Sequence, residues 1–96
     1  MLFAISQPMA GKTKEEIIAE RAKIREEYEN KGWEFKETLI DEFSGEKNAL
    51  WFLGESLKRL SECDYVIFVE GWRGARGCKL ENECCKAYGI KVIERD

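Results

Sequence analysis

Residues 65–69, Tyr-Val-Ile-Phe-Val, form a continuous apolar run that is typical of a strand buried on both faces in the middle of a parallel sheet. Residues 1–5 are a second apolar run, and the Ser-Gln-Pro-Met-Ala-Gly that follows predicts a loop after this strand. Residues 33–39 alternate apolar and polar side chains, which indicates a strand at a sheet edge. Residues 90–93 complete a predicted set of four strands.

Three helical segments separate these strands. Thr13 begins the first helix, because Glu16 completes a capping box three residues later, and the Asn-Lys-Gly of residues 30–32 ends it. The second helix is predicted over residues 47–60, and the third over about residues 78–88. The order along the chain is therefore strand and helix, repeated three times, with one closing strand.

The strict alternation of strands and helices predicts an α/β fold with right-handed crossovers. With the alternating strand at an edge and the wholly apolar strand inside, the four-stranded parallel sheet has the order 2-1-3-4. In that order a crevice opens above the carboxyl ends of strands 1 and 3. The loops of residues 6–12 and 70–77 flank it, and together they contain four of the eight glycines of the chain.

The composition of the 96 residues is that of one globular domain, residues 1–96, with 44% apolar and 36% charged side chains. A formal charge of −3 argues against a protein that binds a nucleic-acid polymer. The chain has no histidine, and its four cysteines include no CxxC pair, so we expect no metal site. Because no apolar run is long enough to span a membrane, we expect a soluble, cytoplasmic protein.

The first loop brings Gly11, Lys12 and Thr13 to a helix N-terminus, where free N–H groups and the helix dipole favour a phosphate. A nucleotide-hydrolysing P-loop is not predicted, because Ser6 stands where that motif needs a glycine. The alternative is that Thr13 is only an N-cap.

The second loop combines one aromatic ring with two guanidinium groups. Trp72 could stack on a base, and Arg73 or Arg76 could bind a phosphate through two hydrogen bonds. The alternative is that both arginines are solvated. Glu81, near the start of the third helix, lies at the rim of the predicted crevice, where its carboxylate could face a sugar. The alternative for Glu81 is a surface residue that complements the helix dipole.

The second helix carries more apolar side chains than one buried stripe needs. Trp51 and Phe52 lie outside the stripe that Leu50, Leu53, Leu57 and Leu60 form. We therefore expect a subunit interface of a homo-oligomer there, with Gly54 permitting close approach. The alternative is that Trp51 packs under a neighbouring loop.

Several of these segments together resemble the nucleoside 2-deoxyribosyltransferase-like superfamily, and most of all a small branch of unassigned function found in phage and prophage genomes. The resemblance is carried by Cys-Asp-Tyr-Val-Ile-Phe at residues 63–68, Gly-Cys-Lys-Leu-Glu at 77–81, Ala-Tyr-Gly at 87–89 and Ile-Ser-Gln-Pro-Met-Ala-Gly at 5–11. It spans nearly the whole chain. It implies a flavodoxin-like (Rossmann-like) three-layer fold and chemistry at the N-glycosidic bond of a nucleoside or nucleotide, without a cofactor.

The resemblance also implies roles for individual residues. Glu81 matches the glutamate that attacks the anomeric carbon, and a second acid protonates the departing base. Where active relatives carry an aspartate for that step, this chain has Ser56 with Glu55 beside it; where they carry a tyrosine on the first strand, it has Phe3. The residues expected to bind substrate are Ser6, Gln7, Pro8, Met9, Gly11, Lys12, Trp72, Arg73, Arg76 and Gly77.

Three functions remain open on the sequence. The first is cleavage of the N-glycosidic bond or deoxyribosyl transfer, with a small nucleoside or nucleotide as substrate. The second is a protein of the same fold that sequesters or senses a nucleotide without cleaving it, which the loss of the aspartate and the tyrosine would permit. The third is an interaction protein whose partner surface includes Trp51 and Phe52.

Overall fold

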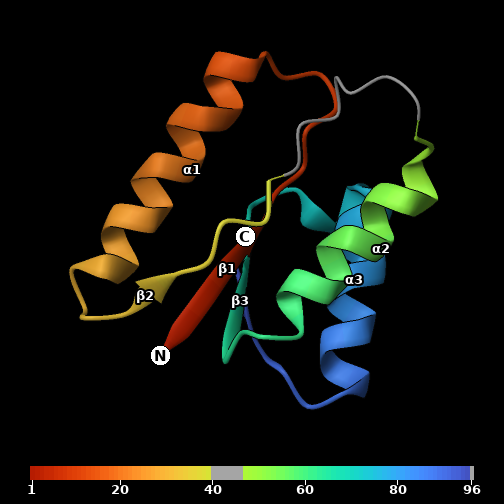
Figure 1. The fold of residues 1–96 in the computed structure, drawn as a ribbon. Helices are drawn as coiled ribbons and strands as arrows, with labels where there is room; N and C mark the ends of the chain where they lie inside the picture. The colour runs from red at the N-terminus through yellow and green to blue at the C-terminus, as the bar shows by residue number, and fades with distance from the viewer. Residues whose placement is uncertain (40–46, 96) are drawn as a thin grey trace.

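The computed structural model of the protein describes residues 1–39 and 47–95 and shows an α/β fold, consistent with the flavodoxin-like class (Figure 1). Four strands form one all-parallel sheet in the order β2-β1-β3-β4. In chain order the elements are β1 (Leu2–Ser6), α1 (Lys14–Glu29), β2 (Glu34–Phe35), α2 (Ala49–Leu60), β3 (Tyr65–Phe68), the 3-10 helix η2 (Trp72–Gly74), α3 (Arg76–Ala87) and β4 (Lys91–Glu94). The predicted fold class and strand order are confirmed.

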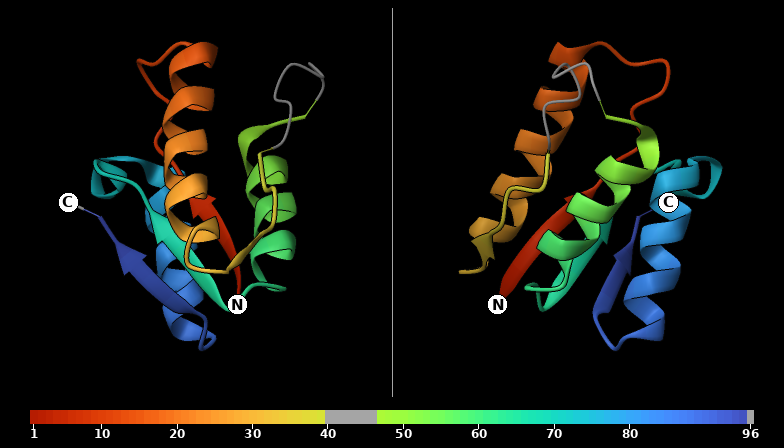
Figure 2. Two further views of the ribbon diagram at one scale, coloured as in Figure 1. Left: turned by 90° about the vertical axis from the view of Figure 1, so that its left-hand side faces the viewer. Right: turned by 45° about the vertical axis from the view of Figure 1, so that its right-hand side comes forward.

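The helices cover both faces of the sheet, so the molecule has three layers, with α1 on one face and α2 and α3 on the other (Figure 2). Because successive side chains of a strand point to opposite faces, β1 and β3 each contribute to two cores. The core under α1 consists of Phe3, Ile5, Ile24, Tyr28, Ile67 and Val69. The core under α2 and α3 consists of Ala4, Leu60, Cys63, Val66, Phe68, Trp72, Cys78 and Cys85.

The helix boundaries follow the expected capping chemistry. Thr13 Oγ1 accepts a hydrogen bond from the backbone N–H of Glu16 at 3.1 Å, and the Glu16 side chain accepts one from the backbone N–H of Thr13 at 3.3 Å, which confirms the capping box. Gly32, just beyond α1, has a φ of +87°, a conformation that favours glycine. Within the described part of the chain, no helix is long and apolar enough to cross a membrane.

Two boundaries differ from the sequence prediction. The edge strand β2 is only two residues long, although the alternation extends to Leu39. The reason lies at Ile5, whose carbonyl accepts hydrogen bonds from the side chains of Arg21 and Thr38 instead of one from the backbone of a longer β2. Helix α3 begins at Arg76, about half a turn earlier than expected, so the loop after β3 is shorter than residues 70–77.

Candidate active site

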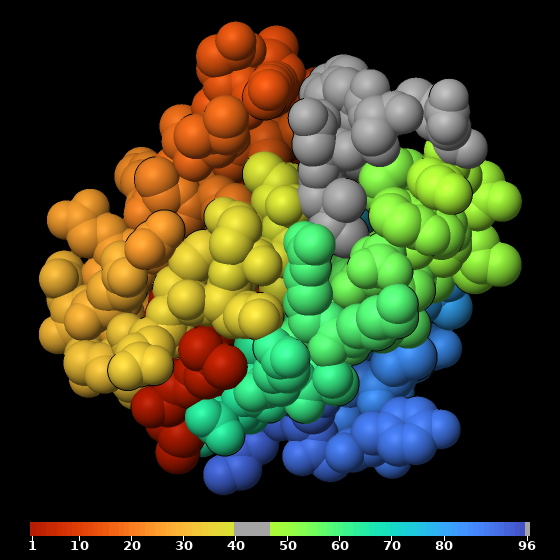
Figure 3. All heavy atoms as spheres, in the orientation of Figure 1, coloured from red at the N-terminus to blue at the C-terminus, as the bar shows by residue number. Residues whose placement is uncertain are grey.

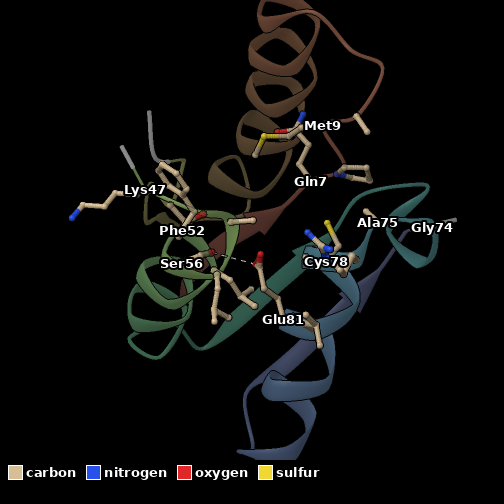
Figure 4. A pocket seen from close by; sticks show the side chains of 18 residues that line it. Gln7, Met9, Lys47, Phe52, Ser56, Gly74, Ala75, Cys78 and Glu81 are labelled. Atoms are coloured by element: carbon tan, nitrogen blue, oxygen red, sulfur yellow. Dashed lines mark hydrogen bonds between the residues drawn. The ribbon is translucent and has the colours of Figure 1, made fainter. Parts of the chain in front are cut away.

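A cleft of about 1020 Å³ opens at the carboxyl end of the sheet, between the loop after β1, the N-terminal half of α2 and the start of α3 (Figure 4). Its lining residues are Gln7, Pro8, Met9, Ala10, Thr38, Lys47, Ala49, Leu50, Phe52, Leu53, Ser56, Gly74, Ala75, Arg76, Gly77, Cys78, Leu80 and Glu81. Residues of the loops 6–12 and 70–77, which the strand order predicts on either side of the crevice, form two of its walls. The predicted position of the cleft is therefore confirmed.

Glu81 lies in the second turn of α3, with its side chain half-buried in the cleft wall. Its carboxylate accepts a hydrogen bond from Ser56 Oγ at 3.4 Å, a contact that joins α3 to α2 (Figure 4). Burial raises the pKa of Glu81 from 4.5 to about 7, and the hydroxyls of Ser6 and Ser56 and the charge of Arg21 only partly offset this rise. A carboxyl group with a pKa near neutral can act as a nucleophile or base when ionised and can donate a hydrogen bond when protonated.

Ser6, at the end of β1, lies behind the cleft wall and does not line the cleft. The residue is buried, and its hydroxyl is close enough to Glu81 and Cys78 to lower the pKa of both groups. Even so, Ser6 Oγ makes no hydrogen bond of regular geometry to any described residue. Ser6, and not Phe3, is therefore the first-strand residue next to Glu81, because Phe3 faces the core under α1.

The structure brings together seven of the predicted site residues. Glu81 and Ser56 form the hydrogen-bonded pair in the cleft. The other five line its walls, namely Gln7, Pro8, Met9, Arg76 and Gly77. The carboxylate and the proline turn after β1 thus share one cleft, as the sequence predicts.

The side chain of Gln7 points away from the cleft interior. Its Nε2 donates hydrogen bonds to the carbonyl of Ile17 at 2.9 Å and to Glu20 Oε1 at 2.8 Å, and its Oε1 accepts one from Arg21 at 3.3 Å. The amide is therefore fully occupied by partners from α1. Gln7 shapes the wall and does not present its amide to a ligand.

Trp72 and Arg73 are not among the residues that line the cleft, and the burial of Trp72 argues against its predicted stacking on a base. The Trp72 side chain is only 6% exposed and packs against Phe68, with the ring centroids 5.5 Å apart. It turns inward because η2 folds the loop back onto the core under α2 and α3. The Arg73 guanidinium lies over the Trp72 ring, 4.6 Å from its centroid, and 3.9 Å from Glu94.

Gly11 and Lys12 also lie outside the cleft, because they lead the chain to α1 on the opposite face of the sheet. Lys12 Nζ forms an ion pair with Glu20 Oε1 at 2.9 Å. Glu55 is likewise not a lining residue; Lys58 Nζ lies 2.8 Å from its carboxylate and holds its pKa below the usual value. An ionised Glu55 cannot supply the proton that a leaving base needs, so the structure argues against its predicted catalytic role.

Several lining residues were not predicted as parts of the site. Phe52 and Leu53 provide an apolar wall on α2, with Leu80 opposite on α3, and Lys47 adds a cation at the rim. Phe52 was assigned instead to a partner surface, since its place on the helix identified it only as lying outside the leucine stripe. Cys78 precedes Glu81 by three residues, and this helical spacing could have placed it on the same face.

Within residues 1–39 and 47–95, no group of three or more His, Cys, Asp and Glu side chains is placed to hold an ion. Among the described residues, the cleft lining combines the carboxyl group of Glu81, the hydroxyls of Thr38 and Ser56, the aromatic ring of Phe52 and the cations of Lys47 and Arg76.

The comparisons with known proteins give a family but no function. No curated protein matches the sequence. The family model described as Domain of unknown function (DUF4406) matches residues 2–94, and the chain therefore belongs to that family.

Proposed function

We propose that the protein cleaves the N-glycosidic bond of a nucleoside or nucleotide, or transfers its deoxyribosyl group, with Glu81 as the nucleophile. The observation that carries this proposal is the position of Glu81 at the cleft, hydrogen-bonded to Ser56 and facing the loop after β1. The resemblance of residues 5–11, 63–68 and 77–81 to the nucleoside 2-deoxyribosyltransferase-like superfamily, in particular to its phage-associated branch, supports the same chemistry.

The proposed reaction has two steps, as in retaining glycoside hydrolysis. In the first, the Glu81 carboxylate attacks the anomeric carbon, the carbon–nitrogen bond breaks and the base leaves with a proton taken from solvent. In the second, water or another base attacks the same carbon and releases a proton to solvent, the ester bond to Glu81 breaks and the carboxylate is restored. Only ionised Glu81 attacks, so the rate is expected to rise as the pH passes the Glu81 pKa of about 7.

The walls of the cleft support a nucleotide as ligand. Phe52 and Leu53 offer an apolar and aromatic surface on which a base can stack. Arg76 and Lys47 are cations on two different walls, and a guanidinium binds a phosphate through paired hydrogen bonds. We propose Phe52 for the stacking role that the sequence had assigned to Trp72, and Arg76 for the phosphate.

The proposal is tested by incubating the protein with a panel of ribo- and deoxyribonucleosides and their 5′-phosphates and separating the products by chromatography. The wild type is expected to release free base, and Glu81→Gln to release none. Glu83→Gln is the matched control, because Glu83 lies two residues away on α3 and is exposed. Base release that survives Glu81→Gln would refute the role of Glu81.

The second candidate function is binding without cleavage. The observation that favours it is that, among the described lining residues, Glu81 is the one carboxylic acid, and Ser56 occupies the position of the acid expected to protonate the base. A hydroxyl group is a poor proton donor at neutral pH. Calorimetry that shows tight nucleotide binding, with the ligand recovered intact, would support this function; no binding across the panel would exclude it.

We further propose a homo-oligomer in the cytosol. Leu50 is 74% exposed and Trp51 41% exposed on α2, which supports an apolar surface that a second copy could cover. A Cβ added at Gly54 would have no described atom within 4 Å, which leaves room for the close approach of a second copy. All four cysteines, each within the described residues, are free thiols, and this supports a reducing compartment.

A further inference from the structure

Arg21 is a buried cation on α1, only 5% exposed, on the face of the sheet opposite α2 and α3. All three nitrogens of its guanidinium donate hydrogen bonds. Nε donates to Glu37 at 3.0 Å, NH1 donates to the carbonyl of Ile5 at 3.2 Å and to Gln7 at 3.3 Å, and NH2 donates to Thr38 at 3.0 Å. A buried charge persists only when it is paired and hydrogen-bonded in this way.

Two of these hydrogen bonds connect Arg21 to residues that line the cleft. Gln7 and Thr38 both line it, one in the loop after β1 and the other in the segment after β2. That segment runs between α1 and α2 on the molecular surface, where it is drawn in yellow (Figure 3). It is held there by Arg21 and by the bond that Thr38 Oγ1 donates to the carbonyl of Ile5 at 3.3 Å.

The network continues from Gln7 along α1. Glu20 Oε1 accepts hydrogen bonds from Gln7 at 2.8 Å and from Lys12 at 2.9 Å, so both ends of the loop after β1 are attached to the helix. Only a planar guanidinium can serve carbonyl, amide, hydroxyl and carboxylate acceptors at once in fixed directions. A lysine at position 21 would keep the charge but lose most of these bonds.

We propose that Arg21 is a positioning residue of the cleft, which acts through Gln7 and Thr38 to fix the wall that faces Glu81. The inference rests on the proposed function, in which that wall holds the substrate against Glu81. Hydrogen bonds to a charged group are stronger than neutral ones, so their loss is expected to loosen both segments while the sheet remains folded.

The charge of Arg21 also acts on Glu81, which provides a second readout. It lowers the Glu81 pKa, in the same direction as Ser6 and Ser56 and against the effect of burial. The titratable groups near Glu81 on α3 are Cys78 and Cys85, and the described cations lining the cleft are Lys47 and Arg76. Replacing Arg21 alters none of these other groups directly.

The test compares Arg21→Lys and Arg21→Gln without any substrate, by NMR. Backbone order parameters of residues 7–10 and 38–39 are expected to fall in both variants, from about 0.85 toward about 0.6. The carboxyl carbon of Glu81 is expected to titrate at a higher pH in Arg21→Gln, where the charge is lost, and close to its wild-type pH in Arg21→Lys. A purely structural role would not separate the two variants in this way.

Arg25 provides the matched control. It lies one turn along α1, pairs with the exposed Glu29 and stacks on Phe35, and neither of these two partners lines the cleft. The same two substitutions at Arg25 are expected to leave order parameters and titration unchanged. If Arg21→Gln does not fold, Thr38→Val removes one arm of the network and serves in its place.

The proposal is overturned if both segments remain as rigid in the folded Arg21 variants as in the Arg25 variants. This outcome is separate from a failure of the proposed function. If base release is absent but the order parameters fall as expected, Arg21 still positions the wall, and only the reaction assigned to the cleft is wrong.

Discussion

The Glu81→Gln variant is expected to gain stability relative to the wild type as the pH rises, because the wild type loses stability when Glu81 ionises. Burial raises the pKa of Glu81 from 4.5 in the unfolded chain to about 7 in the folded protein. Between these two pH values the folded state binds more protons than the unfolded state, so the free energy of unfolding falls as the pH rises. The contribution of neutral Glu81 is fully present below pH 4.5 and is lost as the pH passes about 7.

The magnitude follows from the two pKa values. At about 1.4 kcal/mol for each tenfold change in a proton equilibrium, a rise from 4.5 to about 7 corresponds to about 3 kcal/mol. This is an upper value, because Glu81 is only half-buried and solvent reduces the effect. Glutamine has a similar shape and does not ionise. The stability of Glu81→Gln relative to wild type should therefore increase by up to about 3 kcal/mol between acidic and alkaline pH.

Urea denaturation of both proteins, at pH values below 4.5 and above 7, measures this change. With an m-value of about 1 kcal/mol per M, the difference between the two midpoints should change by up to about 3 M. Titrating groups that do not interact with Glu81 contribute equally to both proteins and cancel. Glu83→Gln, at an exposed site of the same helix, should show no such change. Parallel pH dependence of wild type and Glu81→Gln would mean that burial does not raise the Glu81 pKa.

Three further substitutions test other parts of the structure. Ser56→Ala removes the 3.4 Å hydrogen bond to the Glu81 carboxylate and should raise the Glu81 pKa further; a carboxyl-carbon titration identical to wild type would contradict this. Gly32→Ala places a Cβ at a φ of +87° and should lower the free energy of unfolding by about 1 kcal/mol, whereas unchanged stability in urea would show that the turn relaxes. Trp51→Ser should shift an oligomer toward monomer in size-exclusion chromatography with light scattering; a monomeric wild type at micromolar concentration would refute the interface.

The fold could be predicted because the sequence pattern within each segment indicates the type and the burial of the strand or helix that it forms. The wholly apolar run over residues 65–69 requires burial on both faces, and the alternating run over residues 33–39 requires an edge, so together they fix the strand order. Once that order is known, sheet geometry alone brings the loops after β1 and β3 to one crevice. The position of Glu81 in the cleft follows from the same reasoning, since it lies one turn beyond the second loop.

The directions of individual side chains could not be predicted, because they depend on contacts between segments that are distant in the sequence or on backbone turns. Trp72 turns into the core because Gly71, at a φ of +90°, leads into η2 and folds the loop inward. The side chain of Gln7 points toward α1 because its hydrogen-bond partners there, Ile17 and Glu20, lie ten or more residues further along the chain. Arg21 stands among many charged residues of α1, and nothing in that pattern distinguishes a buried cation from its solvated neighbours.

The carboxyl end of β1 explains why polar groups from both faces of the sheet meet at this cleft. Inside the sheet, the backbone groups of β1 bond to neighbouring strands, and apolar side chains fill both cores. Where β2 stops, the carbonyl of Ile5 has no strand beside it on that side, although Ile5 still pairs with β3 on the other, and buried polar atoms must find other partners. Arg21 reaches that carbonyl from one face, while Ser6 turns its hydroxyl toward Glu81 on the other. The end of the short edge strand therefore explains the buried Arg21, whereas the alternation of side chains along β1 places Ser6 beside Glu81 on the other face.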